Sequence, residues 1–100
     1  MSVTPLRRSD VIGQHAGRET LLYDPVADAV HTLNPTAWAV WELCDGRHTP
    51  ADMATHLRAA FADVSDQDVD ADVLAILAVF AREELIHRYD LAKELGYGPD

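Results

Sequence analysis

The chain has 100 residues, of which 48% are hydrophobic and 25% are charged, as expected for one small globular domain rather than a disordered segment. It carries 8 Lys and Arg residues against 17 Asp and Glu residues, which gives a formal net charge of −9 at pH 7. Such a surface repels phosphate backbones and anionic lipid headgroups. The sequence therefore argues against nucleic acid and membranes as partners.

The sequence also limits the compartment in which the protein works. The longest unbroken apolar run covers residues 73–81, which is too short to span a membrane. No apolar block follows the basic pair Arg7-Arg8, so we expect no secretory signal. Cys44 is the only cysteine, which rules out an intramolecular disulfide. We therefore predict a cytoplasmic protein.

The first third of the chain contains short runs that are rich in β-branched and aromatic residues. They cover residues 10–15, 20–23 and 29–33, and turn-forming residues separate them at 16–19 and 24–28. This spacing predicts a small antiparallel meander of two or three strands. The alternation of side chains over 29–33 is compatible with burial of either face of that strand.

Two helices follow, and each begins at a pair of residues that favours a helix start. Asn34-Pro35 opens the first helix, whose apolar face ends near Gly46. Thr49-Pro50 opens the second helix, which we expect to end near Asp63. The apolar face of the first helix consists of Ala37, Val40, Trp41 and Cys44, and that of the second of Met53, Ala54, Leu57, Ala60 and Phe61.

A third helix is predicted from Val69 to about Glu84, and it is apolar on two faces. We assign one face to the core: Val69, Val73, Ile76, Leu77 and Phe80. The opposite face carries Ala71, Leu74, Ala78, Ala81 and Leu85 instead of polar residues. Two readings of this second face are open. Either the strands or the C-terminal tail of the same chain cover it, or it binds a partner segment or a second copy of the chain.

The residues that usually carry chemistry are scattered. Cys44 and His48 are four residues apart, but Asp45-Gly46 interrupts the helix between them, and no metal-binding spacing is present. The five glycines form no phosphate-binding loop. The alternating acids between residues 66 and 72 lack the glycine and glutamate of a calcium loop. We therefore predict no catalytic residues, no metal and no cofactor.

One continuous stretch resembles a known family. The segments Leu33-Asn34-Pro35-Thr36-Ala37 and Trp41-Glu42-Leu43-Cys44-Asp45-Gly46, followed by Thr49 with Leu57, resemble the PqqD-like family of pyrroloquinoline quinone biosynthesis D proteins and their relatives. The resemblance covers about residues 6–90. It implies an α+β, winged-helix-like fold with a small three-stranded antiparallel N-terminal sheet followed by three helices.

The resemblance also implies a function. Members bind the leader segment of a ribosomally synthesised precursor peptide and present the peptide to a modifying enzyme, often a radical S-adenosylmethionine (radical SAM) enzyme. The leader adds as a strand beside the third strand and packs on the third helix. A free strand edge beside an apolar helix face is suited to such a peptide. The candidate peptide-binding residues are Ala29, Val30, His31, Thr32, Leu33, Leu74, Leu77, Ala78, Ala81 and Arg82.

The resemblance has limits, and alternatives remain. Relatives often have Gly at the position of Glu84. Without this Gly, the third helix is able to continue through Leu85 and Ile86.

We expect a peptide-recognition domain at 1–90 and a tail at 91–100 that is able to fold into the leader's place. The alternatives are a homodimerisation or structural module and a winged-helix DNA-binding regulator. The second is disfavoured because the third helix carries only Arg82 as a basic residue. The chain is either a monomer or a homodimer.

Overall fold

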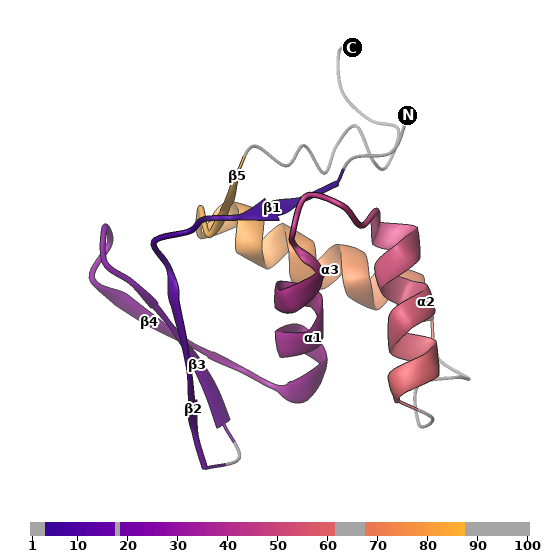
Figure 1. Cartoon of the computed structure of the whole chain (residues 1–100), viewed down its shortest axis with the longest axis horizontal. Coiled ribbons are helices and arrows are strands. Elements are labelled where there is room, and N and C mark those ends of the chain that lie inside the picture. Colours follow the sequence, from indigo (N-terminus) through magenta and orange to yellow (C-terminus); the bar gives the residue numbers. More distant parts are fainter. Residues whose placement is uncertain (1–3, 18, 62–67, 88–100) are drawn as a thin grey trace.

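The computed structural model describes residues 4–17, 19–61 and 68–87, which form an α+β fold with two antiparallel sheets and three helices. Figure 1 shows β2, β3 and β4 on one side and α2 on the other, with α1 and α3 between them. The elements in chain order are β1 (Leu6–Arg7), β2 (Ile12–Ala16), β3 (Glu19–Asp24), β4 (Ala29–Leu33), α1 (Pro35–Leu43), α2 (Pro50–Ala60), α3 (Val69–Arg82) and β5 (Ile86–His87).

The three-stranded sheet has the order β2-β3-β4, which confirms the predicted meander. Leu22 in β3 lies opposite Gly13 in β2 and His31 in β4, and it is fully buried. A Cβ atom on Gly13 would lie 2.8 Å from the ring of Trp38, so α1 packs closely on this inner face. The face of β4 that the sequence left open is thereby fixed, because its residues alternate between inward and outward positions. Ala29, His31 and Leu33 point inward, and Val30 and Thr32 point outward.

A second sheet was not predicted. β1 pairs with β5 through Leu6 opposite His87 and Arg7 opposite Ile86. The expected three-stranded sheet is present, but the β structure is not confined to it, because a second sheet joins β1 to a strand that follows α3. Each of these strands has only two residues, and its partner lies near the other end of the described chain. A two-residue strand has no alternation that a sequence pattern can reveal.

The caps of α1 and α2 are those that the sequence predicts. The Asn34 side chain accepts a hydrogen bond of 2.7 Å from the Ala37 N–H. Thr49 and Asp52 form a reciprocal capping box, with bonds of 3.1 Å and 3.0 Å between side chain and backbone. α2 ends at Ala60, three residues before the predicted end near Asp63.

α3 contributes four buried apolar residues to the core. Val69, Val73, Leu77 and Phe80 are buried, as predicted, and Phe80 meets Trp41 edge-on at a ring separation of 5.4 Å. The rest of the buried apolar cluster comes from the three-stranded sheet, α1, α2, β5 and the segments beside them. Its members are Val11, Leu22, Leu33, Val40, Trp41, Cys44, Met53, Ala54, Leu57, Leu85 and Ile86.

The end of α3 differs from both predictions. The helix ends at Arg82, and Glu84 adopts a left-handed backbone conformation with φ +57°. The Glu84 N–H donates to the Ala81 carbonyl at 3.0 Å, and the Leu85 N–H donates to the Phe80 carbonyl at 2.8 Å. These two bonds define a Schellman motif, which usually has Gly in the left-handed position. The motif buries Leu85, so this residue belongs to the core rather than to the outer face of the helix.

We expect Glu84→Gly to stabilise the protein. A left-handed conformation costs a non-glycine residue about 1–2 kcal/mol, and glycine avoids this strain while losing part of the gain to chain entropy. The net gain of about 0.5–1 kcal/mol should raise Tm by a few degrees in a thermal melt. Glu83→Gly is the matched control, because Glu83 has φ −85° and should gain nothing from glycine. An unchanged or lower Tm for Glu84→Gly would show that the turn carries no strain.

Candidate functional site

β4 is an edge strand along its whole length. All five residues, Ala29 to Leu33, pair with β3, and no other strand of the described residues covers the opposite edge. In an antiparallel strand, every second residue points its N–H and C=O groups away from its partner strand. The outer edge of β4 therefore offers a row of backbone donors and acceptors to an added strand.

The position of β4 distinguishes it from β2, the other edge strand. α1 packs against β3 and β4, and α3 packs against α1 and α2. In Figure 1, α1 lies in front of α3 and β2 lies in front of β4, so the free edge of β4 and α3 are on the same side of the molecule. The free edge of β2 lies on the opposite side of the sheet.

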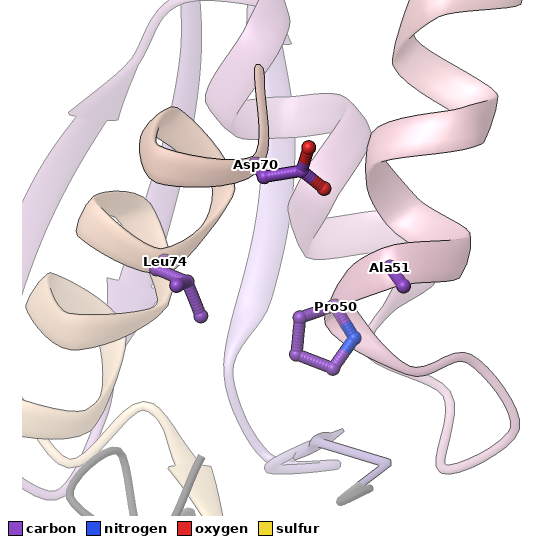
Figure 2. A pocket seen from close by; sticks show the side chains of 4 residues that line it. All are labelled: Pro50, Ala51, Asp70 and Leu74. Carbon is purple, nitrogen blue, oxygen red and sulfur yellow. The ribbon is translucent and has the colours of Figure 1, made fainter. Parts of the chain in front are cut away.

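One flank of α3 faces α2. Leu74 lines a small pocket of about 150 Å³ together with Pro50 and Ala51 of α2 and Asp70 of α3. Figure 2 shows the Leu74 side chain pointing toward Pro50 across this pocket. Arg58 of α2 donates to the Asp70 carboxylate at 2.8 Å on the same flank. Leu74, a predicted peptide anchor, therefore lies beside α2 and is half-buried there.

The other flank of α3 carries an apolar pair that the sequence analysis did not recognise as a site. Val79 is 44% exposed, and Ile76, one turn before it, is half-buried against the core. Residues three apart share a helix face, and this face turns away from Leu74. The helical pattern predicts Ile76 as a core residue and assigns Val79 no role. We call the free edge of β4 and the Ile76–Val79 flank the β4–α3 surface.

The other predicted helix residues occupy different environments. Leu77 is 0% exposed, so it is a core residue, and the expectation that it offers an open anchor is corrected. Ala78 and Ala81 are half-buried, and Arg82 is exposed in the last turn of α3. Leu74, Ala78, Ala81 and Arg82 are nevertheless spaced so that they share one face of α3, on which the three apolar residues are half-buried.

The predicted strand residues divide between the two faces of the sheet. Val30 is 61% exposed and forms a row with Ile12 and Tyr23 on the outer face. The Tyr23 hydroxyl donates to the Asp28 carboxylate at 2.9 Å, and this bond raises the pKa of the phenol. His31 lies on the inner face opposite Leu22 and is half-buried. Only the backbone of β4, rather than one set of its side chains, is directed at the free edge.

The environments of Cys44 and His48 are defined by the fold. Cys44 is fully buried, and burial raises the pKa of its thiol to about 12, so the reactive thiolate is disfavoured at neutral pH. His48 contacts the Asp45 carboxylate at 2.9 Å, which holds the pKa of that carboxyl below its usual range. Among residues 4–17, 19–61 and 68–87, no group of three or more His, Cys, Asp and Glu side chains is placed to hold a metal ion. Within the same ranges, the helices are too short or too polar to cross a membrane.

Comparison with known proteins identifies the family. Among solved structures, the chain is similar to one described as TbiB1 in complex with the TbiA(beta) leader peptide. The two are 19% identical and superpose with a TM-score of 0.70 over 85% of this chain and 98% of that chain, which shows a shared fold. No curated protein matches the chain. The family model of coenzyme PQQ synthesis protein D (PqqD) matches residues 19–86, from β3 to β5. The resemblance read from the Leu33–Thr49 stretch is thus confirmed, and the chain belongs to the PqqD family.

Proposed function

We propose that this protein binds the leader segment of a ribosomally synthesised precursor peptide as an additional strand on β4. The observation that carries the proposal is the free edge of β4, five residues long and on the same side of the molecule as α3. Membership of the PqqD family supports it, as does the similarity to a protein solved with a leader peptide. In this role the protein is a non-catalytic, cytoplasmic chaperone with a winged-helix-like shape.

The β4–α3 surface supplies two kinds of interaction. The edge of β4 contributes backbone hydrogen bonds, which recognise an extended chain regardless of its sequence. Ile76 and Val79 contribute apolar contacts, each worth roughly 1.5–3 kcal/mol when fully buried. Ordering a flexible leader takes back much of this free energy, so we expect a micromolar to high-nanomolar Kd. Arg82, exposed at the end of α3, is available to pair with an acidic residue of the leader.

The bound precursor is then presented to a modifying enzyme, which we propose to be a radical SAM enzyme. A leader held as a strand on β4 is fixed along its backbone, so the segment that follows it remains free to enter another protein's active site. A chaperone of this kind needs only moderate affinity, because the modified peptide has to be released.

An amide-shift titration of the labelled protein with a synthetic leader tests the proposal. The leader is taken from the precursor gene that neighbours this protein's gene. We expect shifts over Ala29–Leu33 and over the Ile76–Val79 flank, and slower hydrogen exchange at every second amide of β4. Shifts over β2 in place of β4 would contradict strand addition at this edge.

The same samples separate the alternatives. Self-association through the edge of β4 would give concentration-dependent shifts without any leader, and sedimentation would then report a dimer. A duplex DNA oligonucleotide serves as the second control ligand. The acidic surface predicts no shifts with DNA at physiological salt, and shifts that weaken with added salt would favour the winged-helix regulator.

A further inference from the structure

Arg8 lies in the link between β1 and β2, and its guanidinium group uses all of its hydrogen-bond donors. It donates to both carboxylate oxygens of Asp24 at 3.0 Å and 3.1 Å and to both of Asp10 at 2.7 Å and 3.0 Å. Its remaining donor reaches the Glu84 carbonyl at 3.0 Å. An arginine has five N–H donors, and this arrangement satisfies every one of them. Lysine has neither the number nor the planar geometry of donors to reproduce it.

One side of this network fixes the start of β4. Asp24 is the last residue of β3, lies opposite Ala29 at the start of β4, and is 2% exposed. The bond from Arg8 is the main reason that the pKa of Asp24 is below its usual range, so the carboxylate is ionised at neutral pH. The same carboxylate accepts the backbone N–H groups of Val26 and Ala27 in the turn that leads to β4. Arg8 thus acts on the turn and on the first residue pair of β4 through Asp24.

The other side of the network fixes the end of α3. The Glu84 carbonyl belongs to the Schellman motif that ends the helix, and the Arg8 backbone N–H donates to the Leu85 carbonyl of the same motif at 3.0 Å. β4 packs mainly on β3 and α1, whereas α3 packs on α1, α2 and β5. Arg8 is therefore a polar connection between the end of β3, which pairs with the start of β4, and the turn that follows α3.

We infer that Arg8 is a positioning residue that fixes the separation of β4 and α3, the two elements between which a bound strand would lie. The inference rests on the proposed function, because the separation matters for a strand that contacts both elements. A surface whose two sides are already held at the correct spacing spends less free energy on ordering when it binds. Arg8 touches no peptide in this arrangement and acts through Asp24 and Glu84.

The separation is measurable without a ligand. Spin labels are placed on Val30→Cys in β4 and Val79→Cys in α3, two exposed positions, while the buried Cys44 stays unlabelled. We expect a narrow distance distribution in the parent protein and a broader or displaced one after Arg8→Lys. Arg58→Lys is the matched control, because its bond to Asp70 joins α2 to α3 and leaves β4 untouched. An unchanged distribution in Arg8→Lys overturns the inference. If Arg8→Lys does not fold, Asp24→Asn replaces it with the same expected broadening.

A second experiment measures the Kd of leader binding by the same variants without spin labels. We expect Arg8→Lys to weaken Kd about tenfold, because the surface must reorganise before it binds, and Arg58→Lys to leave Kd unchanged. A Leu57→Val variant, destabilised in the core at α2, controls for lost stability and should bind as the parent does. Equal binding by Arg8→Lys and the parent contradicts the inference. A parent protein that binds no leader overturns the proposed function, and the distance distribution then decides alone whether Arg8 fixes the spacing.

Discussion

Val79→Asp is expected to weaken leader binding about a hundredfold while leaving the fold intact. The substitution removes an apolar contact of roughly 1.5 kcal/mol and places a carboxylate where the leader would have to desolvate it. Val79 is 44% exposed in the free protein, so a carboxylate is well solvated there and costs little stability. Isothermal titration with the leader measures Kd, and far-UV circular dichroism with a thermal melt checks the fold.

Two variants on the same helix make this result specific. Ala71→Asp adds the same charge at an exposed position outside the Ile76–Val79 flank and should leave Kd unchanged. Leu74→Asp reports on the opposite flank, beside Pro50 of α2. If Leu74→Asp abolishes binding in a folded protein and Val79→Asp does not, the leader lies along the α2 side of α3, and our placement of the site is wrong.

Phe80→Ala is expected to have the largest effect on stability. The side chain is 1% exposed and packs edge-on against Trp41, and the Phe80 carbonyl accepts the Leu85 N–H in the Schellman motif that ends α3. Truncating a buried Phe costs about 3–5 kcal/mol, a large part of the 5–15 kcal/mol typical of a small domain. We expect Tm to fall by roughly 15–30 °C in a cooperative thermal melt.

The neighbouring residue provides the control for this measurement. Val79→Ala removes methyl groups from an exposed position on the same turn and should change the free energy of unfolding by well under 1 kcal/mol. A comparable loss for both variants would mean that the turn, rather than the packing of the Phe80 ring, determines stability. A small loss for Phe80→Ala alone would mean that the core closes over the missing ring.

The sequence predicted the elements whose signals are local. Asn34-Pro35 and Thr49-Pro50 marked two helix starts, and the observed caps use the side chains of Asn34 and Thr49. The runs before Asn34 predicted the meander, and residues 29–33 are the observed bounds of β4. These successes share a cause, because caps, turns and alternation depend on residues a few positions apart.

The failures involve residues that act through distant partners. Helical periodicity placed Leu85 on an outer face, but the left-handed Glu84 turns the chain and buries it. Leu77 satisfies the pattern of a core residue and that of an anchor, and only its 0% exposure decides between them. The direction of Leu74 depends on where α2 crosses α3, which no spacing within α3 encodes. The sequence pattern gave Arg8 no structural role, because its partners Asp24 and Glu84 come from other parts of the chain. The predicted tail at 91–100 lies outside the described residues.

The pairing of β1 with β5 has a consequence for the order in which the protein folds. Leu6 pairs with His87, so this sheet closes a loop that contains almost every other described residue. Closing so long a loop costs entropy that only a nearly complete core can offset, so we expect the β1–β5 sheet to form late. By the same reasoning it is among the first elements to open, and its opening would release the backbone beside Arg8 while α1, α2 and α3 remain packed. Transient loosening of the β4–α3 surface would then begin at the two ends of the described chain.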